Sequence, residues 1–233
     1  MRRFLTVLAL ALTVSCASTS TTSDTPRAHE HTFAFLRIGP KRGEITGEPL
    51  QELMKGHMAN IGKLAGERAL LVAGPMGQGN PEPELRGVFV FATAEVSQAQ
   101  ALCASDPSIA AGVLAAEVVP LRTQQDLRDQ LERALAFEER RKADPSIPMM
   151  DGMSTYALLV ADEGARASKA LEPLRPERRI VFEGQFGGAR EGQALYVLDV
   201  RTLADADMLL APMRGALGAH KLYPWFGSVE LRR

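Results

Sequence analysis

Cysteine is scarce in this chain, because only Cys16 and Cys103 among its 233 residues are of that type. Two cysteines cannot build a disulfide framework, so the fold depends on its hydrophobic core. Hydrophobic residues make up 45% of the sequence, which is ordinary for a globular protein. Cys103 lies in the apolar segment AQALCASD, and we expect it to be a buried hydrophobic residue rather than a nucleophile.

An excess of one charge is also lacking, because 27 lysines and arginines face 28 aspartates and glutamates. This balance gives no electrostatic reason to expect a nucleic acid or an anionic membrane surface as a partner. The glycine-rich segment 74–79 lacks the lysine and the spacing of a phosphate-binding loop. No nucleotide-binding signature is present, and we expect no cofactor.

A long apolar run occurs only at the N-terminus, so no membrane-spanning helix is predicted after it. The segment MRRFLTVLALALTVSCASTS has two arginines, an apolar stretch and small residues around Cys16, as in an export signal. We predict a signal peptide at 1–16, with a lipobox-like end at which Cys16 is lipidated, although Thr13 stands where a lipobox usually has leucine. A flexible tether at 17–31 then holds the protein on a bacterial envelope membrane, facing the periplasm. Cleavage after Ala17 is the alternative and releases a soluble periplasmic protein.

Hydrophobic periodicity divides the rest of the chain into two similar parts joined by a connector. The first part, residues 32–121, predicts the order βαββαβ, with strands at 32–38, 70–73, 87–93 and 112–121 and helices at 50–67 and 96–104. Residues 122–153 contain a charged amphipathic helix with Leu127, Leu131 and Leu135 on one side, followed by a hinge. We interpret this segment as a link between two domains.

The second part, residues 154–233, repeats the pattern with strands at 155–161, 179–183, 194–200 and within 221–231, and helices at 165–174 and 203–211. We therefore predict an α+β fold in which a ferredoxin-like unit occurs twice, as a diverged tandem repeat. Such a unit places both helices on one sheet face and leaves the other face apolar. Two copies can cover those faces for each other, so one chain forms its own pseudo-dimer.

His57 lies on the apolar face of the helix predicted at 50–67, in line with Met54, Ile61 and Leu64, so we expect it to point inward. An imidazole can take and give protons near neutral pH, and a carboxylate such as Asp106 can fix its tautomer. Two structural interpretations stand beside this one. A histidine on an apolar face is often a satisfied core residue, and Asp106-Pro107 is also typical of a helix start with the aspartate as N-cap. Capping and pairing are compatible, because a carboxylate has four lone-pair sites.

The first of the two parts resembles the YciI-like (YCII-related) domain family. The resemblance covers 32–121: a strand ending in Gly39-Pro40, a helix carrying His57, a strand ending in Gly74-Pro75, and the segment SQAQALCASDPSIAAGVLAAEVVPL. It implies a dimeric α/β barrel with a His57–Asp106 pair in a cleft, in a family that includes a dehydrochlorinase of a chlorinated hydroxyquinol. Ser108 and Leu121 depart from aromatic residues that are common in the family.

The second repeat lacks the pair, because alignment places Ala167 at the position of His57 and Met213 at that of Asp106. We assign substrate binding to Arg37, which could orient an anion, and to the Gly74-Pro75 motif. A solvated or salt-bridged Arg37 is the structural alternative. The histidines of His29-Glu30-His31 make an incomplete metal site, and we predict no metal.

These observations lead to two hypotheses about function. The first is a cofactor-independent lyase or hydrolase that acts on a small molecule through His57 and Asp106. The alternative is a non-catalytic binding or assembly module of the envelope. In both cases the lipid anchor is the only contact with a membrane, nucleic acid is not a partner, and further oligomerisation is open.

Overall fold

The computed structural model describes residues 28–232. The predicted signal peptide, the lipidation at Cys16 and the tether up to residue 27 lie outside the described residues. Within them, no helix is long and apolar enough to span a membrane.

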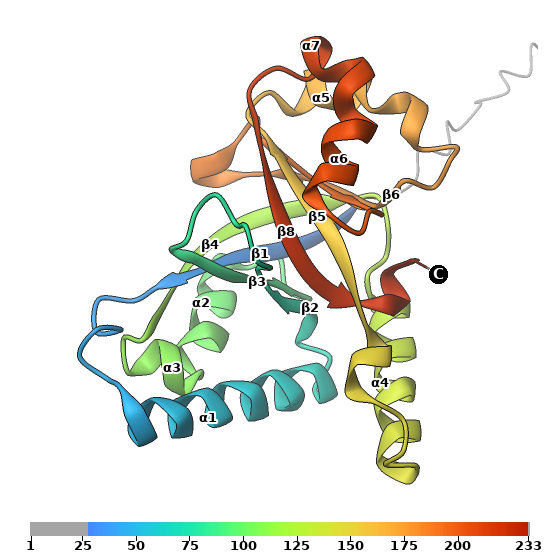
Figure 1. Cartoon of the computed structure of the whole chain (residues 1–233). Coiled ribbons are helices and arrows are strands. Elements are labelled where there is room, and N and C mark those ends of the chain that lie inside the picture. The colour runs from blue at the N-terminus through green and yellow to red at the C-terminus, as the bar shows by residue number, and fades with distance from the viewer. Residues whose placement is uncertain (1–27, 233) are drawn as a thin grey trace, which may run out of the picture.

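The described chain folds into an eight-stranded antiparallel sheet with helices on its outer side (Figure 1). The strand order is β2-β3-β1-β4-β6-β7-β5-β8. At the ends of this order, Met76 after β2 forms a β-bridge with Trp225 of β8, and the Gly77 amide donates a hydrogen bond to the Pro224 carbonyl at 2.7 Å. The sheet therefore curls into a near-barrel, and the predicted α+β class is confirmed.

The elements follow the predicted order on both sides of the helix α4, Arg128–Ala143. Before it come β1 (His29–Ile38), α1 (Gly47–Gly66), β2 (Leu70–Pro75), β3 (Leu85–Phe91), α2 (Val96–Ala104), α3 (Pro107–Ala110) and β4 (Leu114–Thr123). After it come β5 (Met153–Ala161), α5 (Gly164–Ala170), β6 (Ile180–Phe186), β7 (Ala194–Leu198), α6 (Leu203–Leu210), α7 (Arg214–Leu217) and β8 (His220–Ser228). Short 3₁₀ turns occupy Met149–Gly152, Glu172–Leu174, Gly188–Arg190, Ala211–Met213 and Val229–Arg232.

Side chains alternate between the two faces of the sheet and build separate cores. Along β1, Phe33 and Phe35 belong to the inner core of the barrel, whereas Ala34 and Leu36 pack outward against helices. We call the outer core under α1 and α2 the first outer core, and the one under α5, α6 and α7 the second outer core. This division decides which predicted site residues can meet.

The connector helix α4 also contributes to the inner core. Leu127, just before it, and Leu131 are buried there, and Leu135 packs partly against the same cluster. The buried Gln130 side chain donates a hydrogen bond to the Leu71 carbonyl of β2. The predicted apolar side is confirmed, but the helix begins at Arg128 rather than near 123, and it is part of the barrel's packing as well as a link.

One boundary prediction is wrong at the N-terminus. The segment His29-Glu30-His31 was expected in the tether, but it is the start of β1 and pairs with residues 121–123 of β4. The strand start was not predicted because residues 29–31 are all polar and show no alternation of apolar and polar side chains. His31 is 1% exposed, and burial lowers the pKa of its imidazole to about 4, with smaller contributions from neighbouring charges.

Candidate functional site

His57 lies in the middle of α1, on the side that faces the first outer core, and only 7% of it is exposed. Its imidazole stacks on Phe89 of β3, with 6.0 Å between ring centroids and 21° between planes. The helical spacing of α1 therefore turns the ring inward, as the sequence predicted.

Asp106 is wholly buried and uses its two carboxylate oxygens for different partners. Oδ1 accepts hydrogen bonds from the backbone amides of Ser108 at 2.9 Å and Ile109 at 3.4 Å, which makes Asp106 the N-cap of α3. Oδ2 lies 2.7 Å from Nδ1 of His57. The cap and the pair, which the sequence left as alternatives, are therefore both present in one carboxylate.

The electrostatics of Asp106 favour its ionised form. Burial raises the pKa of its carboxyl. The hydrogen bond and charge of His57 and the hydrogen bonds from the Ser108 and Ile109 amides together lower it by more, so the net pKa lies below its usual value. Nε2 of His57 has no hydrogen-bond partner among residues 28–232. An imidazole held at Nδ1 by a carboxylate, with Nε2 unpartnered, can transfer a proton at Nε2.

The close packing of α3 on α1 positions this pair. A Cβ on Gly56 would lie 3.0 Å from the Pro107 ring, so a small residue there lets the two segments approach. The Ser108 hydroxyl donates a hydrogen bond to the Leu53 carbonyl at 3.0 Å. Ser108 is therefore a buried tie between the two helices.

Two cavities occur elsewhere in the described chain. One, of about 590 Å³, is formed by the segments around β6, β7 and α6 together with Arg232. The other, of about 510 Å³, lies between the β2–β3 loop and the start of β8, with Glu82 and Lys221 on its wall. Neither His57 nor Asp106 lines either cavity.

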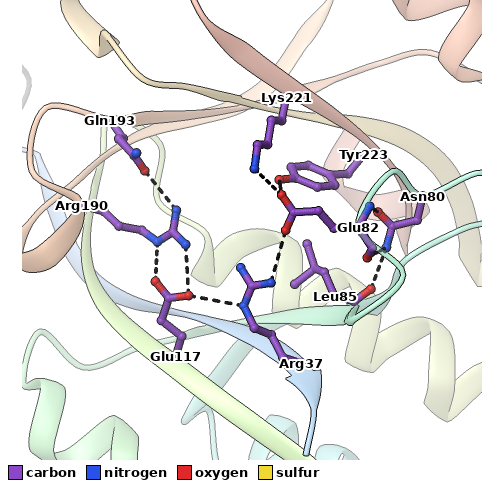
Figure 2. Close-up of polar contacts among 9 residues, drawn as sticks. All are labelled: Arg37, Asn80, Glu82, Leu85, Glu117, Arg190, Gln193, Lys221 and Tyr223. Atoms are coloured by element: carbon purple, nitrogen blue, oxygen red, sulfur yellow. Dashed lines mark hydrogen bonds and ion pairs between the residues drawn. The ribbon is translucent and has the colours of Figure 1, made fainter.

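Arg37 lies away from the His57–Asp106 pair, on the opposite face of the sheet. It follows Phe33 and Phe35 on the inner side of β1 and forms ion pairs with Glu82 at 3.2 Å and Glu117 at 3.5 Å. Figure 2 shows that these contacts belong to a cluster that also includes Arg190 and Lys221. We call these five residues the inner charge cluster. Arg37 is therefore salt-bridged, which was the structural alternative, and it does not share a site with His57.

The inner charge cluster joins the two parts of the chain. Arg190 binds Glu117 through two hydrogen bonds of 2.6 and 3.0 Å, and its guanidinium lies 4.2 Å from the centre of the Phe35 ring. Lys221 and the Tyr223 hydroxyl both donate to Glu82. The hydrogen bond from Lys221 is the main reason why the pKa of Glu82 falls to about 2.

Four members of this cluster were not predicted from the sequence. Glu82 lies 45 residues from Arg37 and 139 from Lys221, so no local periodicity connects them. The only available signal was Arg37 itself, a charged residue at an inward position of an apolar strand.

Gly74 and Pro75 lie at the seam between β2 and β8. A Cβ on Gly74 would lie 1.9 Å from the Phe226 carbonyl oxygen, so this glycine allows the two strands to approach. Pro75 pairs with Gly87 at the end of β2. The contacts of both residues serve barrel closure, and they do not place either residue beside His57.

Cys103 is 3% exposed in the first outer core, as predicted. Burial, with a smaller contribution from the charge of Asp106, raises the pKa of its thiol to about 12. The His29 and His31 rings stack at 6.3 Å, and the described residues include no group of three or more His, Cys, Asp or Glu side chains that could hold a metal ion.

The second outer core has no equivalent of the pair. Ala167 of α5 is completely buried there, and Met213 packs against the same cluster from the turn after α6. Neither side chain can transfer a proton, and His57–Asp106 is the one buried His–Asp pair among residues 28–232.

Comparisons with known proteins place the fold. No family model matches the chain, and no curated protein matches it. Among solved structures, two mutants of chlorite dismutase from Candidatus Nitrospira defluvii, with one arginine changed to alanine or to lysine, are similar in fold. The alanine mutant has a TM-score of 0.52 and 12% identity, and the lysine mutant 0.50 and 13%; each match covers 88% of this chain and 95% of the other. At this identity the likeness supports the dimeric α/β-barrel type of fold and carries no reaction.

Proposed function

We propose that this protein is a YciI-like envelope lipoprotein whose N-terminal half carries a proton-transfer site made of His57 and Asp106. The observation that carries the proposal is the 2.7 Å contact between Nδ1 of His57 and Oδ2 of a wholly buried Asp106. The second oxygen of Asp106 is fixed by the start of α3, so the carboxylate is held before any substrate binds. Preorganisation of this kind is what an acid–base pair needs.

The repeated element order supports an intrachain pseudo-dimer that arose by duplication. In each half the terminal strand of the βαββαβ unit is a neighbour of its first strand, giving the orders β2-β3-β1-β4 and β6-β7-β5-β8. The halves join through β4 and β6, where Leu121 is opposite Phe186. We infer that one half kept the pair while the other kept the barrel closed.

The reaction class that fits is a lyase or hydrolase step without an oxidant. In a dehydrochlorination, Nε2 of His57 takes a proton from a ring hydroxyl of a chlorinated hydroxyquinol. The freed electron pair forms a carbonyl, and the imidazolium returns the proton to the ring carbon that bears chlorine, which becomes tetrahedral. Nε2 then takes a proton from a second ring hydroxyl, whose electron pair forms the second carbonyl. The adjacent ring double bond shifts to the tetrahedral carbon, and the C–Cl bond breaks with its pair leaving on chloride, so that the net loss is HCl. Asp106 stabilises the imidazolium until its proton is released to water.

Chloride release from a chlorinated hydroxyquinol tests the catalytic proposal. We expect His57→Gln and Asp106→Asn to lower the rate at least about a hundredfold, because each removes general acid–base transfer. His29→Gln is the matched control, because His29 is a partly exposed histidine on β1. Thermal unfolding of each variant verifies the fold. The proposal is contradicted if His57→Gln releases chloride as fast as the wild type. It is also contradicted if the folded wild-type protein releases no chloride.

The alternative is a non-catalytic binding or assembly module. It is favoured by one observation, namely that both cavities described above lie away from His57. Under this alternative, the pair only clamps α3 to α1. His57→Gln would then lower the melting temperature while leaving ligand binding intact, whereas the catalytic proposal expects activity to fall even at temperatures where the variant is fully folded.

We also propose that Cys16 anchors the protein to the envelope membrane. The test is to grow bacteria that express the protein with a labelled fatty acid and then to separate their membrane and soluble fractions. Wild-type protein should carry the label and sediment with membranes, whereas Cys16→Ala should not. An unlabelled, soluble wild-type protein supports cleavage after Ala17 and overturns the anchor.

A further inference from the structure

The larger cavity, of about 590 Å³, lies in the second half of the chain and has no role in the proposed function. Its walls come from the residue before β6, the segment from the end of β7 into α6, and the C-terminal 3₁₀ turn. This volume is within the range of small-molecule sites in proteins. The lining residues are Arg179, Asp199, Val200, Arg201, Asp205, Met208, Leu209 and Arg232.

The charges around this cavity do not cancel. Arg232 is paired with Asp199, with 2.7 Å between Nε and Oδ1. Asp205 is occupied by the capping box of α6, where its carboxylate accepts the Thr202 amide at 3.0 Å. Three arginines against two aspartates leave one positive charge on the lining.

Two of the arginines, opposed only by Asp205, account for that excess. Arg179 and Arg201 form no ion pair with any residue in the range 28–232. Nε of Arg179 is buried and has no hydrogen-bond partner among those residues. A buried donor without an acceptor is costly. An anion in the cavity would accept charge-assisted hydrogen bonds from the guanidinium groups that line it. The N-terminus of α6 adds a favourable field at the same place.

Three of the lining residues are apolar. Val200 is buried, and Leu209 is partly buried against the second outer core. Met208 is 68% exposed although it is a large hydrophobic side chain on the cavity wall. Such a wall suits a ligand that has a hydrocarbon portion next to its anionic group.

We propose that this cavity binds an organic monocarboxylate with an apolar chain, its carboxylate held by Arg179 and Arg201 and its chain covering Met208. The planar guanidinium fork matches a carboxylate. One negative charge balances the single positive charge of the lining, whereas a phosphate dianion would overshoot it. This site is separate from the His57–Asp106 pair, which the cavity does not include.

Calorimetric titration of the full chain with octanoate, below its micellar concentration, tests the proposal. We expect saturable binding of one octanoate per chain and no binding of octanol, which lacks the charge. Arg201→Gln should weaken octanoate binding by about tenfold or more, because it removes a charge-assisted hydrogen bond. Arg201 is exposed, so this variant should fold normally. Arg86→Gln is the matched control, since Arg86 is an exposed arginine on β3.

Met208→Glu provides a second variant at an exposed position and should abolish octanoate binding by placing a negative charge on the wall. The proposal is overturned if octanoate does not bind the wild-type chain. It is equally overturned if Arg201→Gln and Arg86→Gln bind octanoate alike, or if inorganic phosphate binds more tightly than octanoate. Loss of octanoate binding would leave the chloride-release test of His57 unaffected, so the two proposals fail separately.

Discussion

The two outer cores of the barrel are built on the same plan and filled differently. In the first, α1 carries His57 over Phe89, and Asp106 reaches it from the start of α3. In the second, Ala167 occupies the aligned position on α5, and Tyr196 lies on the strand that corresponds to β3. The Tyr196 hydroxyl donates to the Gly164 carbonyl at 3.1 Å.

This difference shows what a covered sheet face needs for stability. The buried residues of the second outer core are alanines, leucines, one valine and one tyrosine whose single polar group is satisfied. It needs no buried charge to hold its helices. A buried ion pair is seldom more stabilising than apolar packing of equal volume, so the pair in the first core calls for an explanation other than stability. We propose proton transfer as that explanation.

The largest expected effect concerns the two seams at which the halves meet, one between β2 and β8 and the other between β4 and β6. Gly74→Ala should lower the free energy of unfolding by more than about 4 kcal/mol or prevent folding, because its Cβ would meet a backbone oxygen of Phe226 at 1.9 Å. Gly184 aligns with Gly74, but a Cβ there first meets the Leu121 side chain at 2.6 Å. Gly184→Ala should cost less, since a side chain can move. Urea unfolding of both variants measures this, and equal costs would show that the seams are equivalent.

Replacement of Asp106 should have the next largest effect. Asp106→Ala removes the partner of His57 and the cap of α3 together, and we expect a loss of about 3 kcal/mol. Asp106→Asn keeps an oxygen for the cap and should lose less. Denaturant unfolding at neutral pH measures both. If Asp106→Ala is as stable as the wild type, the carboxylate is not the tie between α1 and α3.

The sequence predicted this part of the site well because its determinants are local. The spacing of His57 with Ile61 and Leu64 indicates an inward side chain, and Asp106-Pro107 marks a helix start by residue type alone. α2 has the predicted bounds Val96–Ala104. Contact between His57 and Asp106, 49 residues apart, came from the family resemblance and not from periodicity.

The inner charge cluster shows where such reasoning ends. Arg37 and Lys221 meet at Glu82 only because the barrel brings the β2–β3 loop next to β8. A contact of this type depends on closure of the whole sheet. The prediction of where β1 begins failed for a different reason. The inward position near its start is taken by His31 rather than by an apolar residue.

A transplanted histidine would sharpen the comparison of the two outer cores. Ala167→His places an imidazole where no carboxylate is available, since Met213 aligns with Asp106. Ala167 is 0% exposed, so overpacking and an unsatisfied polar ring should cost about 2 kcal/mol. Thermal unfolding measures the change. A neutral substitution would mean that the second core tolerates a histidine without its aspartate, which weakens the argument from loss of the pair.

The smallest effect is expected at the inner charge cluster, which both halves share. Glu82→Gln should cost about 1 kcal/mol at neutral pH, since its partners are partly exposed. The folded pKa of Glu82, about 2, lies below its ordinary value of 4.5. Its stabilisation is therefore present above the ordinary pKa and is lost as the pH falls toward 2. Stability curves of the wild type and the variant should converge in acid, and parallel curves would contradict this assignment.

Nitrogen-15 NMR of the His57 side chain tests the central claim most directly, because it reports which ring nitrogen carries the proton without needing a substrate. We predict that the neutral imidazole carries its proton on Nδ1, held by Asp106, and leaves Nε2 without a proton. In Asp106→Asn this preference should be lost. A neutral imidazole protonated at Nε2 with a bare Nδ1 would contradict the proposed proton-transfer site.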